Sequence, residues 1–452
     1  MSLTRSAIML IVSFCLLALP SPAPAADIGE RLSALEKRQE ELAAENRKLR
    51  EELKTPEKAA EAVPQTPAPV GKKAVEFVPY GFVDLTGWAH DARFNASELP
   101  LYVKDESEST TGVTAKRSRL GTKILFPQLE TVKLSATLEI DFFTNMADTG
   151  FAEGYAMIRM RHAFFDLSRT WGASMLGCKI GQTWLTAVPN FFPAVVNPAQ
   201  GWAVGNLWQR MPLAEVYFTQ KFADTFAFTA QLAAVRAITG ASANRNGFLE
   251  VNIDAGDASH IPQIQAQLSL KGKVSGLDLL LAVGGAWGRE NYKGGVLQNR
   301  KTVTYTGGIV DVGLIHPALK IAHEYFELAG KFYWGQNLDG FGAFGGGLLT
   351  EQLDAATVRV IGSRRTMGYW GQVTGKPLKG LSLNIGYGAE DPDQKQEGAA
   401  PGYERNSSLW ISSFYTFFDH VTLGFQWAQV WTDTAGGRLT GNSIMGNVRL
   451  SF

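Results

Sequence analysis

Residues 131–143 read Thr-Val-Lys-Leu-Ser-Ala-Thr-Leu-Glu-Ile-Asp-Phe-Phe, and polar and apolar side chains alternate along almost the whole run. Successive side chains of a β-strand point to opposite faces, so one face of this segment is polar and the other is apolar. A strand of this kind fits a soluble sandwich. It equally fits a transmembrane barrel, where the apolar face meets lipid and the polar face meets water. One strand does not distinguish the two.

The same alternation recurs between turn signals along residues 75–452, and it predicts sixteen strands. They are expected at about 77–90, 116–126, 131–143, 155–167, 172–184, 213–221, 224–237, 261–273, 276–290, 302–315, 318–329, 364–375, 380–390, 405–418, 421–433 and 441–452.

The connections between these strands alternate strictly between short and long. Short ones include 127–130, 168–171, His316-Pro317, 376–379 and Asp419-His420, and long ones include 91–115, 185–212, 238–260, 330–363 and 391–404. Bacterial outer-membrane barrels have an even number of strands, short periplasmic turns and long outer loops. The pattern therefore predicts an all-β transmembrane barrel of 16 antiparallel strands over residues 75–452.

Composition is consistent with this class. The 452 residues include 43 basic and 43 acidic side chains, which argues against a nucleic-acid partner. Of the two cysteines, Cys15 lies in the segment that we expect to be removed, so the single remaining Cys178 cannot form an intrachain disulfide. Beyond the N-terminus, no run is as long and apolar as a membrane helix.

Three segments are expected before the barrel. Residues 1–25 resemble a secretory signal peptide, with a basic start, an apolar core and small residues at the cleavage site; a short membrane anchor is the alternative. Residues 27–54 carry a heptad pattern that predicts a parallel α-helical coiled coil in the periplasm; a single solvated helix is the alternative. Asn46 in the seam often favours dimers, whereas the barrel class favours trimers. Residues 55–74 form a Pro/Ala-rich linker.

The last expected strand places its apolar side chains on one face and ends at Phe452. An aromatic end of this kind is typically read by the machinery that inserts barrels into the outer membrane. We therefore expect that machinery to be a partner.

The third long connection, residues 185–212, is rich in aromatic and amide side chains and carries charge only at Arg210. In sixteen-stranded porins the third outer loop folds into the lumen, and we expect the same here; an ordinary outer loop at a trimer surface is the alternative. The expected constriction residues are Asn190, Phe191, Phe192, Asn197, Trp202 and Trp208.

Basic side chains share the polar face of several strands. Charges are costly towards lipid but not towards water, so these cations are expected to line the lumen and to attract anions. Alternatively, each is a wall charge paired with a neighbouring carboxylate. The expected pore-lining residues are Arg117, Arg119, Lys123, Arg159, Arg161, Lys179, Arg210 and Arg364, with Glu139 and Asp141.

Catalytic and metal-binding patterns are not expected. The six histidines lack metal-ligand spacing, and no nucleophile elbow appears. A barrel phospholipase would need a lipid-facing Ser and His. His162 or His323 could face that way, but neither has a spaced Ser partner. We expect no catalytic residues, no metal, no cofactor and no enzymatic activity.

Several short motifs, in this order, resemble those of the DcaP-like trimeric porins of Gram-negative bacteria. They are Tyr80-Gly-Phe-Val-Asp84, Ser118-Arg-Leu-Gly121, Glu139-Ile-Asp-Phe142, Arg159-Met-Arg-His-Ala163, Gly181-Gln-Thr-Trp184 and Gly386-Tyr-Gly-Ala-Glu-Asp-Pro392. The resemblance implies a homotrimer that passes small anions such as dicarboxylates. It also implies that Arg119, Arg159 and Arg161 belong to a basic pore wall. The sparse charge of residues 185–212 departs from the family pattern.

The sequence thus predicts a porin of the bacterial outer membrane, a channel for passive diffusion of small hydrophilic solutes that prefers anions. Its expected partners are two further copies of the chain, outer-membrane lipid, lipopolysaccharide and, through the coiled coil, peptidoglycan. The alternatives are a structural anchor that uses the coiled coil to contact the cell wall, and a pore selective for phosphate or another oxyanion.

Overall fold

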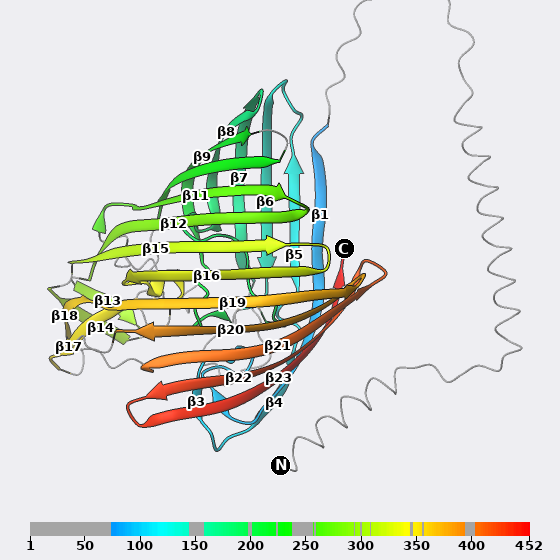
Figure 1. Ribbon diagram of the computed structural model, residues 1–452. Coiled ribbons are helices and arrows are strands. Elements are labelled where there is room, and N and C mark those ends of the chain that lie inside the picture. The colour runs from blue at the N-terminus through cyan, green and yellow to red at the C-terminus, as the bar shows by residue number, and fades with distance from the viewer. Residues whose placement is uncertain are drawn as a thin grey trace, which may run out of the picture. The chain divides into compact units, whose positions relative to one another are not determined.

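The computed structural model describes most of the expected barrel (Figure 1). The described residues are 74–143, 158–197, 201–222, 225–236, 256, 259–292, 294–298, 301–307, 309–343, 347–354, 357–393 and 403–452. The expected signal peptide, coiled coil and all but the last residue of the linker lie outside them.

A single antiparallel sheet closes on itself to form a barrel. Its 17 strands make 16 crossings, because β4 and β5 both pair with β1 and together form one crossing. The strands are β1 (Glu76–His90), β4 (Thr110–Thr114), β5 (Arg119–Leu125), β6 (Val132–Asp141), β7 (Arg159–Trp171), β8 (Ser174–Trp184), β9 (Arg210–Phe222), β10 (Phe226–Val235), β11 (Gln263–Val274), β12 (Leu277–Asn291), β15 (Ile309–Ala322), β16 (Phe326–Gln336), β19 (Arg365–Leu378), β20 (Leu381–Pro392), β21 (Arg405–Phe417), β22 (Val421–Thr434) and β23 (Gly437–Ser451). The predicted barrel of sixteen antiparallel crossings is confirmed.

The first and last strands close the barrel. β1 and β23 pair over nine positions from Phe82↔Ser451 to His90↔Ser443. Beyond them, Gly81 N donates to Phe452 O at 3.0 Å and Phe452 N donates to Gly81 O at 3.1 Å. No edge strand remains where the sheet would otherwise end, which is the condition for a sheet to lie in lipid.

Two small sheets lie in the long connections. β13 (Gly294–Gln298), β14 (Lys301–Thr306), β17 (Leu348–Gln352) and β18 (Thr357–Ser363) form one, and β2 (Arg93–Phe94) pairs with β3 (Val103–Asp105) to form the other. A single 3-10 turn, η3 (Asp339–Phe341), follows β16. Within the described ranges, no helix has the length and apolar character needed to cross a bilayer.

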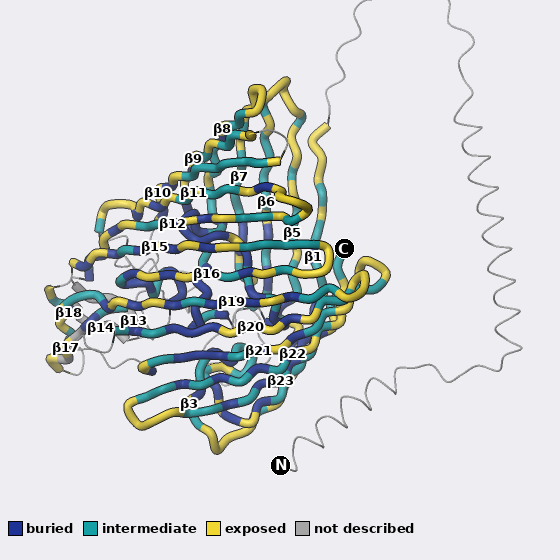
Figure 2. The backbone as a smooth tube through the Cα atoms, viewed as in Figure 1, coloured by how far each residue is buried: buried dark blue, intermediate teal, exposed yellow. Residues whose placement is uncertain are grey.

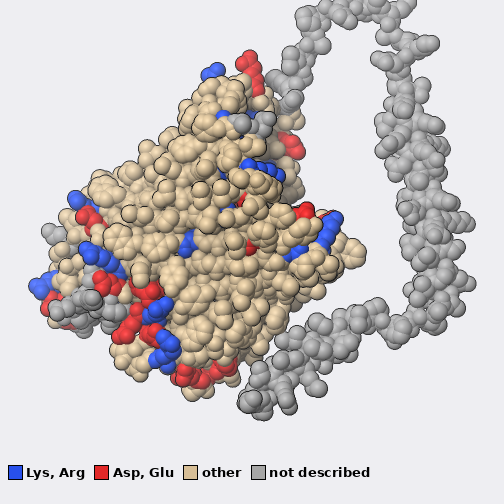
Figure 3. Space-filling model, viewed as in Figure 1, with Lys and Arg blue, Asp and Glu red and all other residues tan. Residues whose placement is uncertain are grey.

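Alternation along the strands separates an apolar skin from a polar interior. On β1, Val83 and Leu85 are exposed, while Asp84 and Thr86, which alternate with them, are fully buried. Figure 2 shows this alternation of exposed and buried positions along many strands. In Figure 3 the wall that faces the viewer is mostly uncharged, and charged side chains gather towards the strand ends. The two-faced pattern read from residues 131–143 is therefore a property of the whole barrel.

Three predicted short turns are misplaced: residues 168–171 lie inside β7 and 376–378 inside β19, so these turns come a few residues later, and the third is further out of place. His316-Pro317 was expected to be a short turn, but β15 runs through it to Ala322, and the turn comes at residues 323–325. Proline has no N–H to donate to a neighbouring strand. Accordingly the β15–β16 register skips from Ile315↔Trp334 to Ala318↔Lys331. The proline interrupts one ladder without ending the strand.

The strict alternation of short and long connections is also wrong at one place. The last connection at the long-loop end is a tight hairpin, in which Thr434 of β22 pairs directly with Gly437 of β23. Gly437 has φ of 117°, a conformation that glycine adopts more readily than other residues, and this allows the tight turn.

We predict that Leu138→Arg destabilises the barrel by about 2–4 kcal/mol, because Leu138 points outward and a cation there meets hydrocarbon. Unfolding by denaturant in lipid vesicles measures the loss. Thr137→Arg is the control, because its side chain points to the lumen, and it should leave stability within about 1 kcal/mol of the parent. Equal losses in both variants would contradict the assigned orientation of β6.

Candidate channel constriction

The connection between β8 and β9 crosses the inside of the barrel. Three backbone N–H groups in it donate to glutamines on the inner faces of three separate strands. Ala187 N bonds Gln265 Oε1 of β11 at 3.0 Å, Ala194 N bonds Gln372 Oε1 of β19 at 2.8 Å, and Val196 N bonds Gln426 Oε1 of β22 at 2.6 Å. These strands are far apart around the wall, so the segment spans the interior; residues 185–209 are called the inner loop below.

Apolar side chains fix both limbs of the inner loop. Leu185 and Leu207, from opposite limbs, are almost completely buried, and they belong to one apolar cluster with Tyr333 of β16 and with Leu338 and Phe341 of the next long connection. Trp208 N also donates to Phe341 O at 3.2 Å. The connection after β16 therefore helps to hold the inner loop.

The first long connection, between β1 and β4, touches the same loop, a contact that was not predicted from the sequence. Asn406 Nδ2 of β21 donates to Leu101 O and to Ala203 O, both at 2.9 Å. Asn197 Nδ2 of the inner loop donates to Glu98 O at 2.7 Å. The available signal was the apolar content of residues 99–103, which is unusual for an exposed connection.

Aromatic side chains of the inner loop pack together near its ends. The ring centroids of Trp202 and Trp208 are 4.6 Å apart, and Trp184 lies 5.6 Å from Trp208 and 5.2 Å from Phe192. Phe191 turns to the opposite wall and contacts Trp370 at 5.9 Å. These are ordinary distances for interacting aromatic rings.

Beside this aromatic group, two carboxylates hold three arginines. Arg159 binds Asp141 through two parallel bonds, Nε to Oδ1 at 2.8 Å and Nη2 to Oδ2 at 2.7 Å. Arg161 binds both acids, with Nε to Glu139 Oε1 at 2.6 Å and Nη1 to Asp141 Oδ2 at 2.8 Å. Arg119 Nε lies 3.5 Å from Glu139 Oε1. Bonds between two charged groups are the strongest type of hydrogen bond, so the guanidinium groups of Arg159 and Arg161 have fixed positions.

A second carboxylate group joins the first and last strands. Asp84 of β1 is fully buried. Its Oδ2 lies 3.0 Å from Arg449 Nη2 of β23, and its Oδ1 lies 4.0 Å from Arg117 Nη1. Arg449 and Arg119 also lie over the ring of Phe82, at 4.2 and 5.0 Å from its centroid. Neither Asp84 nor Arg449 was predicted as a site residue, although both alternate with apolar neighbours and this pattern identifies them as inward-facing.

Together these groups surround a cavity of about 210 Å³. Its lining includes Arg117, Arg119, Arg159, Arg161 and Arg449, with Asp141, Asn197, Phe82, Phe143, Trp184, Phe192 and Trp208. Arg210 is adjacent, 4.5 Å above the ring of Trp184, and no carboxylate of the described residues lies within ion-pair distance of it. Six arginines therefore face three carboxylates (Asp84, Glu139 and Asp141), and the site has a net positive charge.

A β-bulge makes the arginine side of this site denser than simple alternation allows. Along the β6–β7 ladder the register shifts between Glu139↔His162 and Ile140↔Met160, so Arg161 is the extra residue. As a result both Arg161 and His162 point inward, and His162 Nδ1 lies 3.1 Å from Thr183 Oγ1. The lipid-facing orientation considered for His162 is therefore wrong.

The remaining predicted residues are not part of the arginine group. Lys123, Lys179 and Asn190 line a separate polar cavity of about 360 Å³, in which Lys179 Nζ binds Glu215 Oε1 at 3.0 Å. Arg364 lies between β18 and β19, where its backbone N donates to Gly347 O. No cluster of three or more metal-binding side chains occurs in the part of the chain that the structure describes.

No family model and no curated protein matches the sequence. Among solved structures, the outer membrane channel DcaP of Acinetobacter baumannii is similar, with a TM-score of 0.60 and 16% identity over 84% of this chain and 97% of that chain. An anion-selective porin from Comamonas acidovorans has a TM-score of 0.51 and 11% identity over 84% and 100%. A loop-deletion mutant of OmpT, an outer membrane protein of Vibrio cholerae, has a TM-score of 0.50 and 13% identity over 84% and 100%. The resemblance to DcaP-like porins predicted from the sequence is thus confirmed at the level of fold: the chain has the fold of an outer-membrane porin.

Proposed function

We propose that this chain forms a water-filled pore in the bacterial outer membrane, through which small hydrophilic solutes diffuse with a preference for anions. The observation that carries the proposal is the excess of arginines over carboxylates beside the inner loop. Fixed charge on the wall of a narrow aqueous passage raises the local concentration of the opposite ion. Selectivity in such a pore needs no chemical step, so the proposal includes no enzymatic activity.

The arginines are suited to this role because they are held rigidly. Arg159 and Arg161 are hydrogen-bonded to carboxylates and lie 5.7 and 5.8 Å from the ring centroids of Phe143 and Trp184. Arg119 makes a longer ion pair with Glu139 and lies over the ring of Phe82. Guanidinium groups present several donors in one plane, a geometry that matches carboxylates and oxyanions. A passing anion meets donors that are already in place, so little reorganisation is required.

The inner loop supports the proposal by leaving these arginines on one side of the passage. Its own described side chains, which include Asn197, Phe192 and Trp208 in the cavity lining, are uncharged. We infer that the loop narrows the pore and brings solutes close to the basic wall. The solute class is small anions such as dicarboxylates; phosphate and other oxyanions are the alternative, because the same arginine donors fit both.

We predict that Arg119→Ser lowers the anion preference, because it removes one cation from the cavity, and that Asp141→Asn raises it, because it removes a carboxylate. Reversal potentials in planar bilayers under a tenfold KCl gradient measure both shifts, which should have opposite signs. Lys273→Ser is the control, since Lys273 is exposed near a short turn and pairs with Asp278. A cation-selective parent pore would refute the assignment.

Asp141→Asn should also destabilise the barrel, by about 3 kcal/mol, because it removes a buried partner of Arg159 and Arg161. Arg119→Ser should lower the free energy of unfolding by less, since the Arg119 side chain is partly exposed and its distance to Glu139 is longer than the distances from Asp141 to Arg159 and Arg161. Denaturant unfolding in vesicles compares them. Equal stability of the two variants would contradict the assigned carboxylate–arginine contacts.

We further propose that the chain assembles as a homotrimer: the heptad pattern of residues 27–54 supports association, and the resemblance to the DcaP-like trimeric porins supports three copies. Deleting residues 27–73 should weaken trimers without abolishing conductance, because the channel lies in the barrel. Cross-linking in detergent counts the subunits, and bilayer recording counts the conductance steps. Loss of all conductance in a correctly folded deletion variant would contradict this division of roles.

A further inference from the structure

Lys331 is a cation inside the barrel that does not line the arginine cavity. Lys331 lies on the inner face of β16, beneath the inner loop, and only 4% of it is exposed. Its Nζ is 4.7 Å from the ring centroid of Phe191 and 5.0 Å from that of Phe192. Among the described residues, its Nζ donates to Asn206 Oδ1 at 3.4 Å.

No carboxylate of the described residues lies within ion-pair distance of Lys331. Other lysines of the wall differ, because Lys179 pairs with Glu215 at 3.0 Å and Lys320 pairs with Glu327 at 2.8 Å. A buried charge is costly unless it is paired, and an unpaired one is screened little by its surroundings. In place of a carboxylate, the ring faces of Phe191 and Phe192 and the Asn206 oxygen are the groups that stabilise the Lys331 ammonium.

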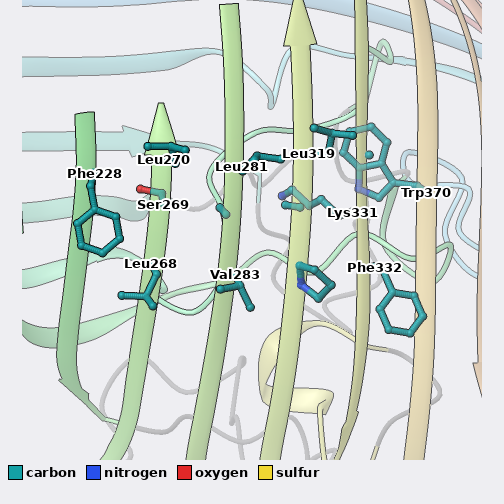
Figure 4. A pocket seen from close by; sticks show the side chains of 14 residues that line it. Phe228, Leu268, Ser269, Leu270, Leu281, Val283, Leu319, Lys331, Phe332 and Trp370 are labelled. Atoms are coloured by element: carbon teal, nitrogen blue, oxygen red, sulfur yellow. The ribbon is translucent and has the colours of Figure 1, made fainter. Parts of the chain in front are cut away.

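On the wall itself, no hydrogen-bond partner of Lys331 occurs among the described residues, although the buried imidazole of His316 on β15 lies near enough to interact with it electrostatically. Figure 4 shows Lys331 among Leu281, Leu319, Phe332 and Trp370, at the edge of a groove of about 650 Å³ on the outer side of the barrel. Apolar side chains line most of this groove. The contacts that satisfy the ammonium group thus come from the inner loop.

Lys331 contacts both limbs of that loop. Phe191 and Phe192 belong to one limb and Asn206 to the other, and Asn206 Oδ1 also accepts a bond from Trp370 Nε1 at 3.1 Å. Phe192 in turn contacts Trp208 at 5.7 Å, and both rings line the arginine cavity. One aromatic ring therefore separates the lysine from the passage.

We propose that Lys331 is a positioning and selectivity residue of the constriction. It holds the two limbs of the inner loop together, and its unneutralised charge adds to the anion-attracting field of the arginines. The second part rests on the proposed function, because it assumes that ions pass beside Phe192. The first part depends only on the contacts of the loop.

Asn206 provides a direct test, because its Nδ2 is buried and has no hydrogen-bond partner among the described residues. Asn206→Asp replaces that unpartnered group with an oxygen of nearly the same size and places a carboxylate beside Lys331. The loop keeps its connection to the wall while the lysine charge is neutralised. Lys331→Met instead removes both the charge and the connection, with little change in side-chain length.

Single channels of the full chain are recorded in planar bilayers under a KCl gradient, with Lys320→Met as the control because Lys320 lies two residues from the end of β15 and Lys376 remains a partner of Glu327 in that variant. Both test variants should lower the anion-to-cation permeability ratio by roughly twofold, the effect of a screened unit charge several ångströms from the passage. Only Lys331→Met should increase the open-channel current noise, because only it frees the loop. The control should match the parent in both measurements.

An unchanged permeability ratio in Asn206→Asp would overturn the electrostatic part. This measurement tests that part even where Lys331→Met fails to assemble. Current noise in Asn206→Asp as high as in Lys331→Met, or parental noise in Lys331→Met, would overturn the positioning part. A parent pore that prefers cations would refute the proposed function, but the comparisons of the two variants with the parent would still be valid. In that case each variant is still measured relative to the parent.

Discussion

The structure depends on the requirement that no backbone N–H or C=O group remain unpaired where lipid surrounds the chain. The barrel meets it by joining its first and last strands, where Gly81 and Phe452 exchange two hydrogen bonds. The β15–β16 ladder is interrupted at Pro317, a residue with no N–H to leave unpaired. Once the wall is closed, each strand residue faces either lipid or the interior, and that choice places the charged side chains inside or at the strand ends.

The same requirement explains how the interior accepts a long loop. A segment inside a barrel is cut off from much of the solvent, so its backbone needs partners just as a strand does. Gln265, Gln372 and Gln426 provide them, because each places a side-chain carbonyl on the inner face where a loop N–H can reach it. The wall therefore presents uncharged amide acceptors to a loop that itself carries no charged side chain.

Much of the fold could be predicted from the sequence because alternation is a local property. It placed Leu138 outward and Glu139 inward, and it located most strands to within a few residues. It failed where one residue changes a local rule: the bulge at Arg161 reverses which of the following side chains face inward, and Pro317 reads as a turn although the strand continues. Neither event leaves a distinctive pattern in residue types.

The candidate site was less predictable because its contacts join distant parts of the chain. Arg449 and Asp84 are 365 residues apart and meet only because the barrel closes, while Lys331 and Asn206 meet only because a loop crosses the interior. Composition is no guide either, since the chain as a whole carries equal numbers of acidic and basic residues. An ion in a narrow passage responds to charges within roughly one Debye length, about 8–10 Å at physiological salt, and buried charges are screened even less. A chain of zero net charge can therefore enclose a strongly basic cavity, provided that closure gathers arginines from β5, β7, β9 and β23 around it and leaves most of the carboxylates elsewhere.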